Sequence, residues 1–191
     1  MRVDSFKDAI IGIGAGLQPD GDWLPTFFLE KDGKMAIIGM AVDLNNEKGK
    51  DQAAYLMTTL IALTNADAAC FISTAWVGKP NPDGTFIRPS KHPLRKEAVT
   101  GYCMGVKGES DGESMMIGYI QRSPNKPPVI THWDMYESEK TDELTTKGRF
   151  PDAMREGFRR ADPQGHLGRL DAFLKKEGYK QDEGTGNPPG K

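Results

Sequence analysis

The stretch Phe27-Phe-Leu-Glu-Lys-Asp-Gly-Lys-Met-Ala-Ile-Ile38 decides how the first part of the chain folds. Two apolar, strand-like runs flank the dipeptide Asp32-Gly33. Asp-Gly in this position is typical of a two-residue type I′ turn, because both central residues of that turn need a positive φ. The sequence therefore predicts an antiparallel β-hairpin at residues 27–38.

The segment after the hairpin predicts a helix from Gly49 to Asn65. Its apolar residues recur with helical spacing, at Ala53, Leu56, Met57, Leu60, Ile61 and Leu63. Few charges follow Asp51, so we expect this helix to be buried over most of its circumference and to form the centre of the core. Asn45, Asn46 or Asp51 is available to cap its start.

Four strand-like runs follow the helix, at residues 68–77, 97–106, 114–122 and 129–136. The polar turn at 107–113 suits a hairpin, and we expect the third to fifth strands of the chain to form a meander. The order β-β-α-β-β-β-β predicts an α+β fold in which a mostly antiparallel sheet packs on the central helix.

The two ends of the chain predict further helices and a tail. A helix at residues 4–15, capped by Asp4 or Ser5, precedes a turn within 1–22, and the sheet with its helix occupies 23–136. A polar loop at 137–151 leads to helices within 152–179, the first capped by Asp152 and the second running from His166 to Glu177. We expect one domain over 1–179 and a disordered tail at 180–191, which is polar and rich in Gly and Pro.

Composition limits the function classes. The 191 residues carry a formal net charge of −2, which gives no global reason to bind nucleic acid or a membrane. No apolar stretch approaches the ~20 residues that span a bilayer, and Asp4 and Asp8 stand where a secretory signal needs a basic start. We therefore expect a cytoplasmic protein. Cys70 and Cys103 lie in apolar runs without CxxC spacing and predict buried thiols, not a disulfide framework or a metal site.

Several motifs fall short of a catalytic or cofactor site. Gly12-Ile-Gly-Ala-Gly16 lacks the preceding buried strand of a dinucleotide fingerprint, so no cofactor is expected. His132 and Asp134 share a strand face and begin a metal site, but without the fuller ligand set that zinc prefers we expect no metal. Trp76 and Trp133 lack the paired aromatics of an RNA-binding strand, which makes nucleic acid an unfavoured partner.

The segment at 78–97 is locally basic and stiffened by prolines. It gathers cations and one of the three histidines of the chain, in the order Lys79, Arg88, Lys91, His92, Arg95 and Lys96. Such groups bind phosphate or carboxylate through charge-assisted hydrogen bonds. Arg95 and Glu97 are two residues apart at a strand start, so we expect them to point the same way and to be able to pair. Plain scaffolding by a surface connection is the alternative reading.

The leading hypothesis is a non-enzymatic binding or regulatory protein. Its ligand-binding residues are Arg88, Lys91, His92, Arg95 and Trp76, its partner is an acidic protein or a phosphorylated small ligand, and a homodimer is plausible. The first alternative is a hydrolase-type enzyme acting on a phosphate- or carboxylate-bearing substrate. In it His92 is the acid or base, Glu97 or Asp134 orients the imidazole, and Arg95 stabilises charge. The second alternative is a phage structural or assembly component.

The block Ala75-Trp76, followed by Pro89-Ser-Lys-His-Pro-Leu-Arg-Lys-Glu97, resembles a stretch of uncharacterised bacterial and phage proteins. The likeness covers about residues 66–122. It implies a small cytoplasmic or phage-encoded accessory protein, and it assigns no activity and no role to any residue.

Overall fold

One antiparallel sheet with helices against it forms the fold. The computed structural model describes residues 6, 8–12, 24–78, 91–106, 112–124, 126–138 and 148–178. Within them the elements run β1 (Thr26–Lys31), β2 (Lys34–Gly39), α2 (Glu47–Thr64), β3 (Ala68–Val77), β4 (Lys96–Gly105), β5 (Gly112–Ser123), β6 (Lys126–Ser138), α3 (Arg149–Arg159) and α4 (Arg169–Lys176). The six-stranded sheet has the order β2-β1-β3-β4-β5-β6. This confirms the predicted α+β class and the meander, which extends from β3 to β6.

The hairpin between β1 and β2 forms as predicted. Lys31 pairs with Lys34 across a two-residue turn. Asp32 and Gly33 both have positive φ, at 51° and 73°, which is the backbone of a type I′ turn. Asp67 strengthens this corner, because its carboxylate accepts from the Asp32 N–H at 2.8 Å.

Helix α2 begins two residues before the predicted start. The Asn46 Oδ1 accepts from the Gly49 N–H at 2.8 Å and caps the helix, and Asn65 ends it in the left-handed conformation. The buried residues form one stripe, at Gly49, Ala53, Leu56, Met57, Leu60, Ile61 and Thr64. The expected burial of most of the circumference applies to the second half of the helix, whereas Tyr55 in the first half is 56% exposed.

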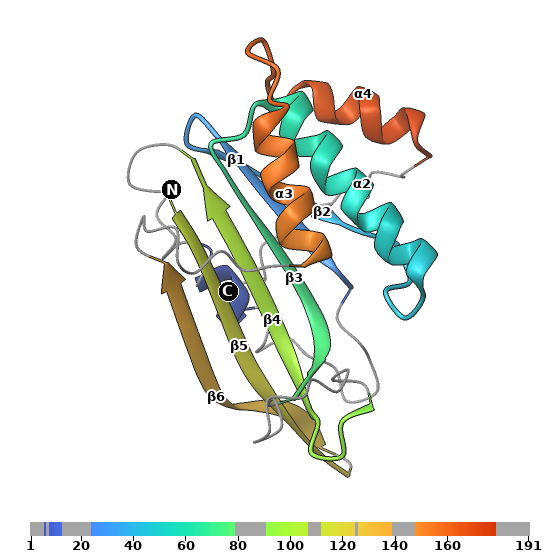
Figure 1. Ribbon diagram of the computed structural model, residues 1–191, viewed down its shortest axis with the longest axis vertical. Helices are drawn as coiled ribbons and strands as arrows, with labels where there is room; N and C mark the ends of the chain where they lie inside the picture. The colour runs from blue at the N-terminus through green and yellow to red at the C-terminus, as the bar shows by residue number, and fades with distance from the viewer. Residues whose placement is uncertain are drawn as a thin grey trace, which may run out of the picture.

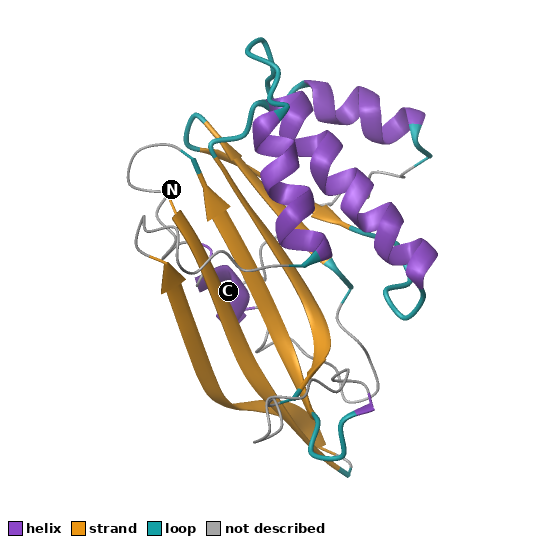
Figure 2. Ribbon diagram, viewed as in Figure 1, coloured by secondary structure: helices purple, strands orange, loops and turns teal. Residues whose placement is uncertain are grey.

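Helices α2, α3 and α4 lie together on one face and toward one end of the sheet (Figure 1). Figure 2 shows that the other end of the strands extends beyond this helix layer. The main core lies between the layers: Phe27, Leu29, Phe71 and Tyr102 from the strands pack with α2, α3 and α4. Because α2 is the innermost helix, it contributes the largest share of the buried side chains.

A second, smaller core lies on the opposite face of the sheet. The helical residues at 8–12 lie behind the sheet in Figure 1. Phe6 and Ile10 pack there against Phe28, Cys70, Ile72, Val99, Cys103 and Met116. A Cβ at Gly101 would lie 2.3 Å from the Ile10 Cδ1, so glycine in β4 gives Ile10 room to reach the strand.

Several predicted boundaries shift. Strand β6 begins at Lys126 and includes Pro127 and Pro128, which the sequence places before the strand. Helix α3 begins at Arg149 with Gly148 at the cap, so Asp152 lies in its first turn and does not cap it. Helix α4 is shorter than predicted, at Arg169–Lys176. The predicted tail at 180–191, the ends of the N-terminal helix and most of the polar loop lie outside the described residues.

In the described parts of the chain, no helix combines the length and the apolar character needed to cross a bilayer.

Candidate functional site

The predicted binding segment connects β3 to β4, and the structure describes its two ends. Arg88 and Lys79 lie outside the described residues. Lys91 is exposed, but His92 is buried, with only 7% of its surface exposed. The His92 Nδ1 accepts from the Leu94 N–H at 3.0 Å, and a Cβ at Gly78 would lie 3.2 Å from the imidazole. His92 therefore folds the segment back onto the end of β3 and is not presented to a ligand.

Arg95 and Trp76 form a stacked pair on one face of the sheet. The Arg95 guanidinium carbon lies 4.7 Å from the centre of the Trp76 ring, and Trp76 is 46% exposed. Trp76 is opposite Glu97 in the β3–β4 register. The predicted Arg95–Glu97 pair does not form. The Glu97 carboxylate accepts from Arg122 of β5 at 2.8 Å and 2.6 Å instead, because the fork of Arg122 reaches both carboxylate oxygens.

Lys96 stacks on an aromatic ring of the opposite face. Its ammonium group lies 5.2 Å from the centre of the Tyr119 ring in β5. Successive residues of a strand point to opposite faces, so Lys96 shares the face of Tyr102 and the helix layer, and Glu97 lies on the other face. Arg95, just before β4, stacks on Trp76 on that second face. The end of the sheet thus carries one cation over an aromatic ring on each face.

Asp134 contacts the side chains of Tyr119 and His132, and Tyr119 is the ring on which Lys96 stacks. Its carboxylate accepts from the Tyr119 hydroxyl at 2.7 Å, and the His132 Nε2 lies 2.7 Å from its other oxygen. The Tyr119 and His132 rings are stacked, with centres 6.1 Å apart. The predicted shared face of His132 and Asp134 is therefore confirmed. In the ranges that the structure describes, no group of three or more His, Cys, Asp or Glu residues is placed to hold a metal ion.

The Tyr119 hydroxyl is a measurable probe of this cluster. Its hydrogen bond to the Asp134 carboxylate raises the pKa of Tyr119 to about 12. Asp134→Asn removes the carboxylate charge, so we expect the pKa of Tyr119 to fall toward the ordinary tyrosine value of about 10. NMR of protein labelled at the tyrosine Cζ, titrated from pH 9 upward, measures this shift. An unchanged Tyr119 titration in the variant would contradict the assignment of the hydrogen bond.

No family model, curated protein or solved structure matches the chain. The role of this region is therefore argued from its own geometry, and the resemblance of residues 66–122 to uncharacterised proteins stays a prediction.

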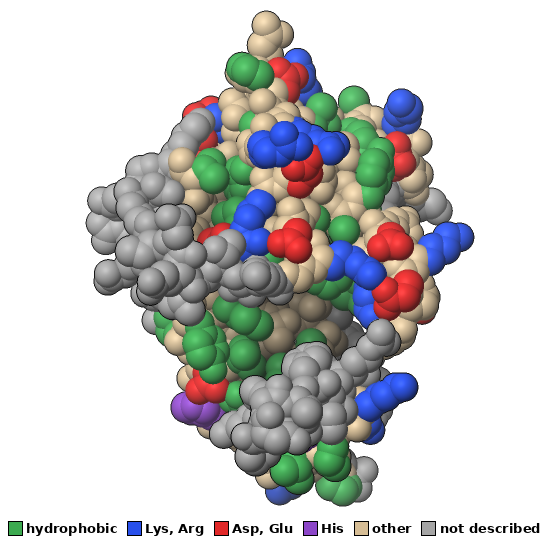
Figure 3. All heavy atoms as spheres, viewed as in Figure 1, with side chains coloured by type: hydrophobic (Ala, Val, Ile, Leu, Met, Phe, Trp, Pro, Cys, Tyr) green, Lys and Arg blue, Asp and Glu red, His purple; other side chains and the backbone are tan. Residues whose placement is uncertain are grey.

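The helix layer pairs its arginines with carboxylates. Arg155 binds Glu113 through two nitrogens at 2.8 Å and 2.9 Å, and Arg149 binds Glu47 at 2.5 Å. Lys50 and Arg149 together lower the pKa of Glu47 to about 2. Figure 3 shows blue and red side chains intermixed over this part of the molecule. The arginines of the helix layer are thus neutralised within the protein, whereas Lys48, Lys175 and Lys176 of that layer are exposed and have no ion pair among the residues that the structure describes.

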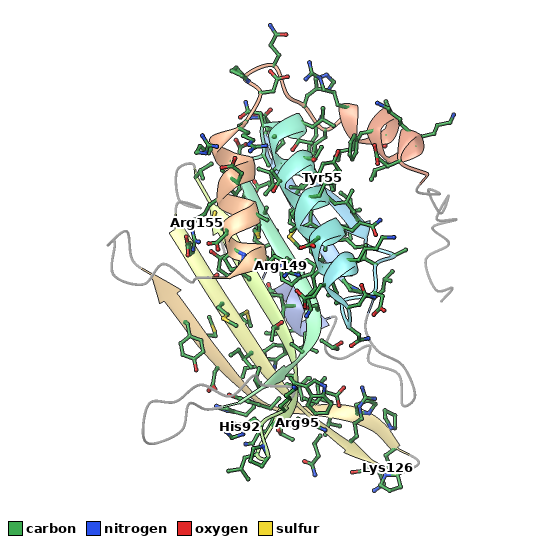
Figure 4. The ribbon with its side chains drawn as sticks, turned by 45° about the vertical axis from the view of Figure 1, so that its right-hand side comes forward. Tyr55, His92, Arg95, Lys126, Arg149 and Arg155 are labelled. Carbon is green, nitrogen blue, oxygen red and sulfur yellow. The ribbon has the colours of Figure 1, made fainter. Side chains whose placement is uncertain are left out.

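At the opposite end of the sheet five exposed cations lie together, and we call this group the cationic end: Lys91, Arg95, Lys96, Arg122 and Lys126. Figure 4 shows Arg95 and Lys126 at this end, with His92, and Arg149 and Arg155 on the helix layer. Among the residues that the structure describes, Lys91, Lys96 and Lys126 have no carboxylate within ion-pair distance. The cationic end therefore carries charge that is available to a partner.

Sequence reasoning found part of this end and missed part. It selected Lys91, Arg95 and Trp76, which the structure brings to the same end. It missed Arg122 and Lys126, because they follow β4 in the chain and reach this end only through the antiparallel pairing of β5 with β4 and of β6 with β5. The predicted meander could have revealed them, because alternate connections of a meander lie at the same end of the sheet. The β3–β4 and β5–β6 connections therefore lie close together.

Proposed function

We propose that this is a small cytoplasmic, non-enzymatic binding protein that engages an acidic protein partner through its cationic end. The observation that supports this most is the gathering of exposed cations at one end of the sheet. Lys91, Lys96 and Lys126 are exposed without a carboxylate partner in the described part of the chain, and Arg95 lies beside Lys96 at the same end. Unpaired surface cations of this kind attract and orient an acidic partner.

The spread of the cations favours an acidic protein over a phosphorylated small ligand. Arg95 immediately precedes β4 and Lys96 begins it, and the two side chains lie on opposite faces, with Trp76 under one and Tyr119 under the other. Side chains on two faces do not converge on a single phosphate group. An extended acidic segment that passes around the end of the sheet contacts both.

The local geometry supports binding over hydrolysis. The hydrolase alternative requires His92 to exchange a proton with a substrate beside an orienting carboxylate. His92 is buried and its Nδ1 accepts a backbone hydrogen bond, while Glu97 binds Arg122 and Asp134 binds Tyr119. Stacking of Arg95 on Trp76 also limits the rotamers of the cation, which lowers the entropy lost on binding.

A peptide-binding experiment tests the proposal. The probe is a fluorescein-labelled peptide of ten glutamates, followed by anisotropy at low and physiological salt. The test variant is Arg95→Gln, Lys96→Gln and Lys126→Gln together. We expect its Kd to rise about tenfold, because exposed charge pairs each contribute a fraction of a kcal/mol up to about 1 kcal/mol, and its melting temperature to stay unchanged.

A second triple variant is the control. Lys48→Gln, Lys175→Gln and Lys176→Gln remove the same net charge from exposed positions of the helix layer. We expect this variant to bind like the wild type. Equal weakening in both variants would show that only net charge matters. Competition by millimolar inorganic phosphate would favour a phosphorylated ligand, and assembly of the protein with itself as its concentration rises would favour a structural component; each of these results overturns the proposal.

A further inference from the structure

The two cysteines of the chain face each other across adjacent strands. Cys70 of β3 and Cys103 of β4 are directly opposite in the antiparallel register. The Cys103 thiol donates to the Cys70 sulfur, and the two sulfurs lie 2.7 Å apart. Both are free thiols with 1% or less of their surface exposed, as the sequence predicts. Residues directly opposite in such a pair hold their Cβ atoms about 4.5–5.5 Å apart, close to the ~3.5–4.5 Å of a disulfide.

We propose that Cys70 and Cys103 are a redox modification site, oxidised by a peroxide to a disulfide that joins β3 to β4. The thiolate of one cysteine attacks the peroxide, an S–O bond forms as the O–O bond breaks, and the first water leaves. The second thiol then displaces the hydroxyl of the sulfenic acid, and the S–S bond forms as the second water leaves. Two thiols lose two electrons and two protons, and the peroxide takes up both.

Ser114 of β5 lies beside the cysteine pair and provides an independent observation. It is opposite Cys103 in the β4–β5 register and is buried, with 5% of its surface exposed. Its hydroxyl oxygen has no hydrogen-bond partner in the part of the chain that the structure describes. A buried hydroxyl without a partner is unusual and calls for an explanation. When Cys103 becomes a thiolate or a sulfenic acid, the unused Ser114 hydroxyl opposite it would be a hydrogen-bond donor for these polar forms and would stabilise them.

The N-terminal helical residues control access to the thiols. Phe6 and Ile10 pack over the same cluster as Cys70 and Cys103 and are themselves at most 1% exposed. Burial also raises the pKa of the Cys70 thiol, which slows oxidation of the closed protein. Oxidation therefore requires this cover to lift from the sheet. Once formed, the disulfide closes a loop that contains the whole segment at 78–97 and constrains the unfolded chain.

The experiment treats the full chain with hydrogen peroxide and measures intact mass, the linked peptide and the melting temperature. We expect a mass loss of about 2 Da, a peptide that joins Cys70 to Cys103, and a melting temperature raised by roughly 5–10 °C. Cys70→Ser and Cys103→Ser should each abolish all three changes. Ser114→Ala should slow the reaction several-fold.

Two neighbouring isoleucines of the N-terminal helical residues provide a test variant and a matched control for the access of peroxide to the thiols. Ile10 is fully buried and Ile11 is 40% exposed. Ile10→Ala should oxidise faster than the wild type, with Ile10→Val as the milder variant if the first folds poorly, and Ile11→Ala should oxidise at the wild-type rate. Two free thiols retained in folded Ile10→Val after prolonged treatment would overturn the proposal. So would a gain of oxygen on one cysteine without the linked peptide.

Discussion

Phe71→Ala is expected to lower the free energy of unfolding by about 4 kcal/mol. Phe71 lies in the middle of β3, is 4% exposed and belongs to the core between the sheet and the helices. Its ring centre is 4.8 Å from that of Phe150 in α3, at an interplanar angle of 55°. Truncation leaves a cavity where the sheet contacts α3. The strand and the helix are both held by their own packing, so neither moves easily to fill it.

Urea denaturation followed by circular dichroism measures this loss. Phe71→Leu keeps most of the apolar volume and should cost less than half as much. Tyr55→Ala removes an aromatic ring that is 56% exposed on α2, so it should change the stability by about 0.5 kcal/mol or less. A similar small effect for Phe71→Ala would contradict the packing of α3 on the sheet.

Local signals in the sequence predicted the elements that depend on local chemistry. The Asp32-Gly33 turn, the apolar spacing of α2 and the run at Ala68–Val77 all match the structure, because positive φ and periodic burial leave marks within a few residues. The predicted N-cap of α3, Asp152, was wrong by four residues, because Gly148 caps the helix. Glycine has no side chain that could accept a capping hydrogen bond, so the sequence contains no capping residue at position 148. Asp152, which is a typical capping residue, lies in the first turn of the helix.

Long-range pairing explains what the sequence did not reveal. Arg122 takes the carboxylate of Glu97 from across the β4–β5 pairing, and Tyr119 meets Asp134 across β5 and β6. These contacts depend on strand register, and a β-bulge near Tyr119 shifts that register in a way that alternation of polar and apolar residues does not encode. The same limit applies to His92, whose burial depends on packing against Gly78.

The charge pattern links the fold to the proposed function. The helix layer covers one end of the sheet and neutralises its arginines, and the strands extend the cationic end beyond that layer (Figures 2 and 4). Cys70 and Cys103 are paired in β3 and β4, and Trp76 lies near the end of β3 while Arg95 immediately precedes β4. The proposed disulfide would therefore cross-link the two strands whose ends hold part of the cationic end.

Gly49→Ala is expected to cost about 3 kcal/mol, although alanine is the better helix former. Gly49 is in the first turn of α2, where its N–H donates to the Asn46 cap. A Cβ at this position would lie 1.9 Å from the Asp43 carbonyl oxygen. That carbonyl belongs to a tightly bonded turn, because the Asp43 carboxylate accepts from the Asn45 N–H at 2.9 Å and from the Asn46 side chain at 2.6 Å. The methyl group therefore forces the turn and the cap apart.

The same substitution at Gly12 is the control for Gly49→Ala. A Cβ at Gly12 meets nothing within 4 Å, and Gly12 is helical, so Gly12→Ala should leave the stability unchanged or raise it by up to about 1 kcal/mol. Thermal and urea unfolding of the two variants separate steric conflict from helix propensity, because propensity alone predicts a gain at both positions. Equal stability of Gly49→Ala and the wild type would mean that the turn at 43–46 does not pack against the start of α2.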